Sequence, residues 1–128
     1  RTMKDYSFAQ ILRAADAAGT QAANALTPTP MRVQEYQGIG ESRRKVGNPI
    51  TISEGPCGYA WVVIRPATTR FARWAKKQGF CDKNYGGGYS FSITQYGQSF
   101  EKKYAHANAF AKVLTEFNIN ALAEGRMD

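Results

Sequence analysis

The stretch from Gly55 to Asp128 alternates between strand and helix patterns, and this alternation restricts the possible folds more than any other feature of the chain. Within it, Tyr59–Ile64 is apolar on both sides, which is typical of a strand in the middle of a sheet. Tyr89–Thr94 alternates between apolar and polar residues, so we predict a strand with one face exposed to solvent. Ala121–Glu124 is predicted to return as a short edge strand, which completes a β-α-β-α-β unit.

A long helix is predicted before this unit. Ser7 and Gln10 have the spacing of a capping box, in which a hydroxyl and an amide each satisfy a free N–H group at a helix start. The helix is expected to run to about Leu26, because two prolines follow. Gly19 lowers helix propensity, so we expect a bend or a frayed turn there.

The second and third helices fall inside the alternating stretch. The second is predicted between Pro66 and Gly79, and the third begins at Ser99. We expect Trp61, on the central strand, and Trp74, on the second helix, to be largely buried.

Between the first helix and the alternating stretch, we predict two further strands and a long connection. Met31–Tyr36 alternates like a strand, and Pro49–Glu54 is predicted as its return partner. The polar segment 37–48 contains three glycines, so we predict an exposed loop or hairpin tip.

These elements predict a single α+β domain over residues 1–128. Domains most often have about 100–150 residues, and no linker or internal repeat divides the chain. We expect an antiparallel or mixed sheet of four to five strands. The second and third helices should pack on one face, with the N-terminal helix close by. Arg1 and Thr2 precede Met3, a suitable initiator, and are expected to derive from an expression vector.

Several classes of protein and of site are disfavoured by composition. No apolar run approaches the roughly 18 residues of a membrane span, and no signal-peptide pattern opens the chain. Cys57 and Cys81 are far apart and match no redox or metal motif, so we expect a cytoplasmic protein with free thiols and no membrane partner. We expect neither a metal nor a cofactor, because one histidine and two distant cysteines fit no usual zinc spacing.

No catalytic residues are predicted either. His106 is the single histidine, and the helical pattern places it at the margin of an apolar arc, where a local hydrogen bond is expected. The three glycines at 86–88 precede a strand rather than a helix, so they favour a flexible loop over a phosphate-binding loop.

Positive charge is the strongest functional signal. The formal net charge of +7 favours an anionic partner, either nucleic acid or an acidic protein. Basic residues interleave with tyrosines, so that cations could follow a phosphate backbone while rings stack on unpaired bases. The alternative is a solvated helix face with buried rings. The candidate binding residues are Arg65, Arg70, Arg73, Lys76 and Lys77 around the second helix, Arg43, Arg44 and Lys45 in the long loop, and Tyr85, Tyr89 and Tyr96.

Several short motifs resemble those of a group of small proteins, of unknown activity, that tailed bacteriophages and metagenomic phage contigs encode. The motifs are Gly55–Trp61, Phe71–Trp74, Tyr85–Gly87, Tyr96–Ser99, Tyr104–Leu114 and Gly125–Asp128, with Pro28–Met31 before them. The resemblance implies expression inside an infected bacterium. It implies no catalytic or binding residue, and segment 37–48 is longer here than in those proteins.

The first hypothesis is therefore a non-enzymatic phage accessory protein that binds a macromolecule, with nucleic acid as the leading ligand. The second is a protein-binding inhibitor of a host defence or metabolic enzyme, and the third is a small enzyme.

Overall fold

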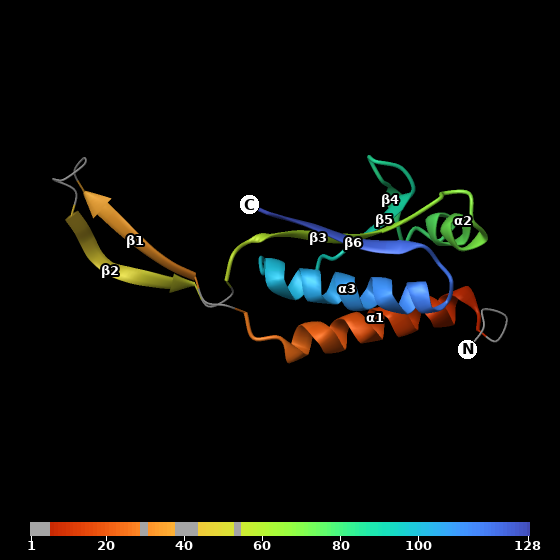
Figure 1. Ribbon diagram of the computed structural model, residues 1–128, viewed down its shortest axis with the longest axis horizontal. Helices are drawn as coiled ribbons and strands as arrows, with labels where there is room; N and C mark the ends of the chain where they lie inside the picture. The colour runs from red at the N-terminus through yellow and green to blue at the C-terminus, as the bar shows by residue number, and fades with distance from the viewer. Residues whose placement is uncertain (1–5, 29–30, 38–43, 53–54) are drawn as a thin grey trace.

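The computed structural model describes residues 6–28, 31–37, 44–52 and 55–128, and for residues 31–37 and 44–52 it describes the backbone alone. The elements are α1 (Phe8–Ala25), β1 (Met31–Gln37), β2 (Arg44–Ile52), β3 (Gly58–Ile64), α2 (Arg70–Lys77), β4 (Asp82–Lys83), β5 (Tyr89–Ser92), α3 (Phe100–Glu116) and β6 (Ala121–Met127) (Figure 1). The predicted α+β class is confirmed.

The main sheet has four strands in the order β4-β5-β3-β6, and every neighbouring pair is antiparallel. The apolar strand β3 lies in the interior of this sheet, as predicted, and β6 lies at its edge. Val62 sits opposite Phe91 of β5 and Ala123 of β6, so apolar residues of three strands share one face.

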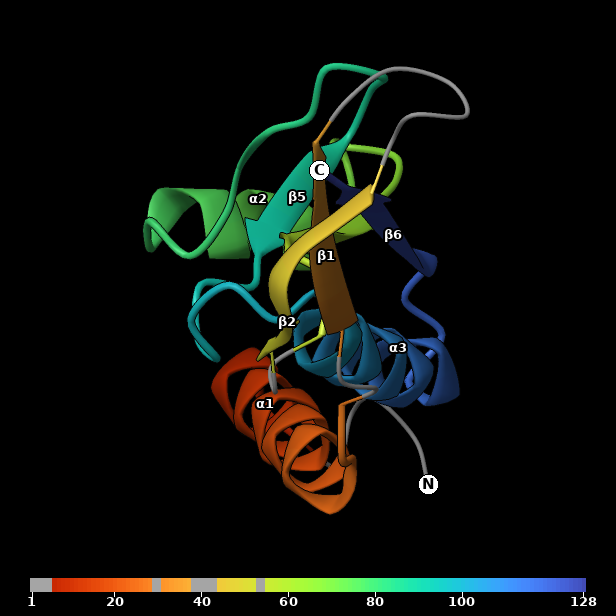
Figure 2. The ribbon, with the colours of Figure 1, turned by 90° about the vertical axis from the view of Figure 1, so that its left-hand side faces the viewer.

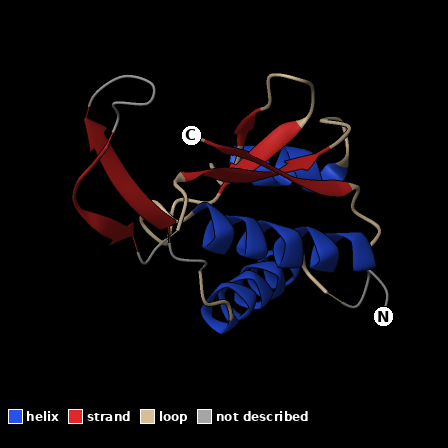
Figure 3. Cartoon of the chain, turned by 60° about the vertical axis from the view of Figure 1, so that its left-hand side comes forward, coloured by secondary structure: helices blue, strands red, loops and turns tan. Residues whose placement is uncertain are grey.

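The helices form layers on that face. α3 packs against β3 and β6, and α1 packs against α3, so the order is sheet, α3, α1 (Figures 1 and 3). The core lies between sheet and α3, where Ile64, Leu114 and Phe117 are almost fully buried. Each such side chain contributes about 1.5–3 kcal/mol when it leaves water.

The other face of β3 is only partly covered. Val63 is buried there, but Tyr59 is 49% exposed and Trp61 is half-buried. Most of the Trp61 surface is covered, as predicted, although this ring is not fully buried. Trp61 is paired with Glu124 on the neighbouring strand β6, and its Nε1–H donates to Glu124 Oε1 at 3.0 Å. Trp74 is also half-buried, against Phe8, Phe71 and Phe80, because α2 lies beside the layers instead of between them.

The indole hydrogen bond gives a small, specific stability prediction. Trp61→Phe keeps most of the ring but removes the donor, so the free energy of unfolding should fall by about 0.5–1.5 kcal/mol. Urea denaturation measures this decrease in the free energy of unfolding. In a Glu124→Ala background the same substitution should change stability far less, and an equal loss in both backgrounds would show that the hydrogen bond contributes nothing.

α1 begins as predicted but is more regular than expected. Ser7 Oγ accepts from the Gln10 N–H at 3.1 Å, and Gln10 Oε1 accepts from the Ser7 N–H at 2.9 Å. The helix continues without interruption through Gly19, so the predicted bend is wrong. Gly19 is buried, and its missing side chain makes room for the ring of His106 from α3.

β1 and β2 form a separate two-stranded antiparallel sheet. This hairpin extends from the end of the molecule opposite α2 (Figures 1 and 2). Lys45 pairs with Tyr36 and Arg44 pairs with Gln37, so β1 includes Gln37 and β2 begins at Arg44. The predicted loop or hairpin tip over residues 37–48 is therefore too long at both ends. Arg43 lies outside the described residues.

Candidate nucleic-acid interface

α2 is anchored by its apolar side. Thr69 caps it, with Oγ1 accepting from the Ala72 N–H at 3.2 Å. Phe71 and Ala75 are buried, as is Ala72 between them, and the Phe71 ring contacts Phe91 of β5 and Phe8 of α1. This packing fixes which side of the helix faces solvent.

The solvent side of α2 is wholly cationic. Arg70, Arg73, Lys76 and Lys77 are all exposed, and α2 contains no acidic residue. Exposed cations contribute only about 0–1 kcal/mol each to stability even when paired. The fold therefore does not require this concentration of charge, which we call the α2 basic face.

Arg65 connects this helix to the turn between β4 and β5. It follows β3, and its Nε–H donates to the Gly87 carbonyl at 3.2 Å. Asn84 donates to the same oxygen at 2.9 Å. Gly87 and Gly88 have φ values of 104° and 73°, and a Cβ at Gly88 would collide with the backbone of Ile64. Gly87 and Gly88 thus form a turn that a hydrogen bond from Arg65 joins to the end of β3 and that a second, from Asn84, holds together. The glycines precede the strand β5 and not a helix, as predicted.

This turn presents Tyr85, whose side chain is fully exposed. An exposed aromatic ring is available to stack on a partner. Because Arg65 holds the turn, Tyr85 and the start of α2 belong to the same end of the molecule.

The other two candidate tyrosines are partly buried. Tyr89 is on the helix-covered face of the sheet, opposite Ile64, and is half-buried against the core. Tyr96 is half-buried, and its hydroxyl contacts His106. Arg44 and Lys45 are on the distant hairpin. The structure therefore links Arg65 to the turn that carries Tyr85, at the end of the molecule where α2 lies. Tyr89 lies at that end too, but its ring packs against the core, whereas Tyr96, Arg44 and Lys45 lie elsewhere.

A cavity of about 820 Å³ adjoins the α2 basic face. Arg65 and Arg70 line it, together with residues from the start of α1 and from the turn after α3, and none of the lining residues that the structure describes is acidic. We call it the arginine cavity. Sequence patterns could not reveal it, because its three segments are far apart in the chain.

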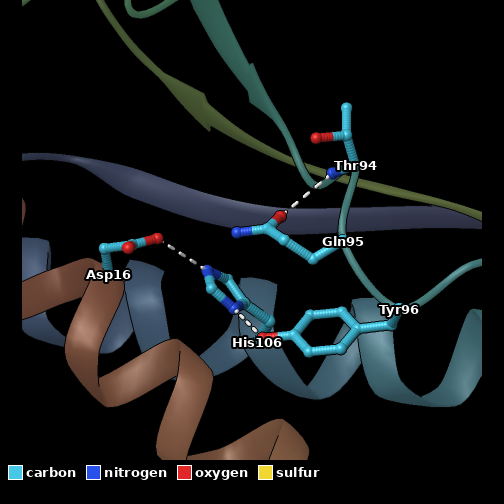
Figure 4. A network of polar contacts seen from close by, with 5 residues as sticks. All are labelled: Asp16, Thr94, Gln95, Tyr96 and His106. Carbon is cyan, nitrogen blue, oxygen red and sulfur yellow. Dashed lines mark hydrogen bonds and ion pairs between the residues drawn. The ribbon is translucent and has the colours of Figure 1, made fainter.

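His106 occupies a second polar site. Its side chain is fully buried, so the predicted position at the core margin is wrong. Nδ1 lies 2.7 Å from the Tyr96 hydroxyl, and Nε2 lies 3.2 Å from Asp16 Oδ1 of α1 (Figure 4). The Asp16 contact has the distance of an ion pair, but Nε2 has no well-aligned hydrogen bond. Burial lowers the pKa of His106, and the nearby Asp16 carboxylate opposes this shift only in part.

The order of carboxylate, imidazole and hydroxyl is that of a nucleophilic triad, but the geometry is not suited to catalysis. A cavity of about 650 Å³ is lined by Asp16 and His106, yet Tyr96, which carries the hydroxyl, is not part of its lining. The three residues come from α1, α3 and the segment after β5, so the network ties these elements together.

Other reactive groups show no site in the described part of the chain. Burial raises the pKa of Cys81 to about 11, so its thiol is a poor nucleophile near neutral pH. Among the residues that the structure describes, no three His, Cys, Asp or Glu side chains gather closely enough to hold a metal ion.

The His106 network predicts a pH dependence of stability. Because the folded pKa is lowered below the ordinary value of 6.5, the unfolded chain binds more protons near and below that pH. The contribution of neutral His106 to stability is complete above the pKa of the unfolded state, and it decreases as the pH falls through that value. The melting temperature should therefore fall from about pH 7 to about pH 5.5, above the range in which most carboxylates titrate.

His106→Gln provides the control for this experiment. The variant should be less stable at neutral pH, but its melting temperature should fall by less than that of the wild type over the same decrease in pH. An identical pH profile would show that another group is responsible.

Comparison of the chain with protein-family models, curated proteins and solved structures gives no match. None of the described helices combines the length and apolar character that a membrane crossing requires.

Proposed function

We propose that this protein is a non-enzymatic phage accessory protein that binds nucleic acid in the infected bacterium through the α2 basic face. The observation that carries the proposal is the group of exposed cations on α2, a helix that contains no carboxylate. This group adjoins a cavity lined by one of these cations, Arg70, and by one further arginine, Arg65, and none of the described residues of the lining is acidic. The phage origin is supported by the sequence motifs alone.

Single-stranded nucleic acid fits this surface best. Sequence-tolerant binding of single strands combines cations that follow the backbone with aromatic rings that stack on bases. Arg65 holds the turn that carries the exposed Tyr85 ring, so one aromatic platform lies near the cations.

The test is fluorescence anisotropy with labelled single-stranded DNA, single-stranded RNA and duplex DNA between about 50 and 200 mM salt. Single strands should bind more tightly than duplex. Contact of all four α2 cations with phosphates would give a slope of about −3 in log K against log salt, at about −0.7 per contact.

Tyr85→Ala should weaken single-strand binding by about 5- to 150-fold, which corresponds to about 1–3 kcal/mol of stacking. Tyr59→Ala is the matched control, because Tyr59 is also exposed but lies at the other end of β3. Equal effects of the two substitutions would remove Tyr85 from the site.

Absence of wild-type binding to all three probes at low salt would contradict the proposal. The same cations would then favour an acidic protein surface, as in an inhibitor of a host enzyme.

A further inference from the structure

The arginine cavity lies where three segments meet: the start of α1, the connection from β3 to α2, and the turn between α3 and β6. Its volume of about 820 Å³ falls within the range of about 300–1,000 Å³ that small-molecule sites occupy. Its size and its position beside the α2 basic face identify it as a candidate ligand site.

Its electrostatic character favours an anion. Arg65 and Arg70 both line the cavity, and Arg65 also donates from Nε to the Gly87 carbonyl of the turn between β4 and β5, which is not part of the lining. The N-terminus of α1, an 18-residue helix with no acidic residue in its first turn, also opens onto it. The partial positive charge of that helix end adds to the two guanidinium charges.

Its remaining lining favours a ligand with a flat ring. Tyr6 and Phe8 are partly exposed aromatic residues at the start of α1. Each is supported from behind, since the Tyr6 ring meets Phe117 edge-on at 5.3 Å and the Phe8 ring meets Phe71 edge-on at 5.4 Å. A supported ring offers a rigid surface for stacking.

Amide groups complete the lining. Asn118 and Asn120 are exposed in the turn after α3, and both line the cavity. Asn118 has a φ of 63°, a conformation that asparagine tolerates better than most residues. The Arg65 N–H donates to the Asn120 carbonyl at 3.2 Å, which fixes the turn beside the arginines. Amide side chains both donate and accept, as recognition of a base edge requires.

We infer that the arginine cavity binds one nucleoside monophosphate unit. The phosphate contacts Arg65 and Arg70, the base stacks on Tyr6 or Phe8, and the asparagine amides contact the base edge. The unit belongs either to a bound strand or to a free nucleotide. Its assignment to a strand rests on the proposed function. Arg70 supports this assignment, because it belongs both to the cavity and to the α2 basic face.

The experiment compares two arginines of the same helix. Arg70 and Arg73 are both exposed and lie one turn apart, but only Arg70 lines the cavity. Calorimetric titration with adenosine 5′-monophosphate should show that Arg70→Gln weakens binding about tenfold or more, the loss expected for one charge-assisted hydrogen bond. Arg73→Gln should leave this affinity unchanged. Equal effects of the two variants, or no binding of the nucleotide to the wild type, would overturn the inference.

Two further titrations test the base contacts and the source of the nucleotide. Inorganic phosphate should bind more weakly than the nucleotide, and equal affinities would refute a base-binding cavity. Adenosine 5′-monophosphate should also displace a labelled single strand if the unit belongs to that strand.

The outcomes separate this inference from the proposed function. If strands bind but the nucleotide does not, the cavity assignment is wrong and the proposed function stands. If the nucleotide binds in an Arg70-dependent manner but no strand does, the cavity serves a free nucleotide and the proposed function is wrong.

Discussion

Reversing Arg70, Arg73 and Lys77 to glutamate is expected to abolish nucleic-acid binding while leaving the fold intact. All three side chains are exposed on α2, whereas Phe71 and Ala75 hold the helix to the core from the other side. The substitutions therefore remove three phosphate contacts and add three repulsive charges without disturbing buried groups.

The salt dependence makes this prediction sharper. Each lost contact should reduce the slope of log K against log salt by about 0.7 for single strands, so three should reduce it by about 2. The difference between variant and wild type should be largest at low salt, where screening is weakest. Anisotropy titrations measure both quantities, and far-UV circular dichroism checks the fold.

A second triple variant controls for net charge. Arg13, Lys112 and Arg126 are exposed on α1, α3 and β6, and their reversal to glutamate changes the formal net charge by the same amount. This variant should retain most of the binding and lose only the general attraction of a basic protein. Equal loss in both variants would mean that net charge, and not the α2 basic face, determines affinity.

Gly19→Ala is expected to destabilise the protein by about 1–3 kcal/mol, the usual effect of overpacking. This effect on stability is opposite to the usual one, because replacing glycine by alanine in a helix interior normally stabilises a protein by about 1 kcal/mol. A Cβ at Gly19 would lie 2.5 Å from Cδ2 of His106 and 2.6 Å from its Nε2. The imidazole has little freedom to move away, since Tyr96 holds its Nδ1 at 2.7 Å. α1 and α3 would have to separate instead.

The control is the same substitution in a His106→Ala background. Without the imidazole there is room for the new methyl group, so Gly19→Ala should then stabilise the protein by up to about 1 kcal/mol. Urea denaturation of the four proteins gives the coupling energy. A wild-type background that is unaffected or stabilised by Gly19→Ala would contradict the close packing of the two helices.

Local signals in the sequence determined most of the secondary structure. The caps at Ser7, Thr69 and Ser99 each operate within one helical turn, and the predicted capping box of Ser7 and Gln10 forms. The exposure of the α2 cations was predictable for the same reason, because the apolar residues of one short helix define its buried side. The central position of β3 followed from its continuous apolar character.

Tertiary structure alone decided which residues meet. His106 is buried because Asp16 and Tyr96 converge on it and Gly19 leaves space for its ring. Asp16 and Gly19 belong to α1 and Tyr96 lies after β5, so none of the three is on α3 with His106. Trp61 lies on the face that no described helix covers, so its apolar character did not determine its burial.

The arginine cavity shows the same division between local and distant effects. The sequence by itself determined that Arg65 and Arg70 flank the start of a basic helix. Only the packing of α1 and of the turn after α3 beside them made a cavity with aromatic and amide walls. The physical reason is range: caps and periodicity depend on neighbours within a few residues, whereas a cavity depends on how separate segments pack together.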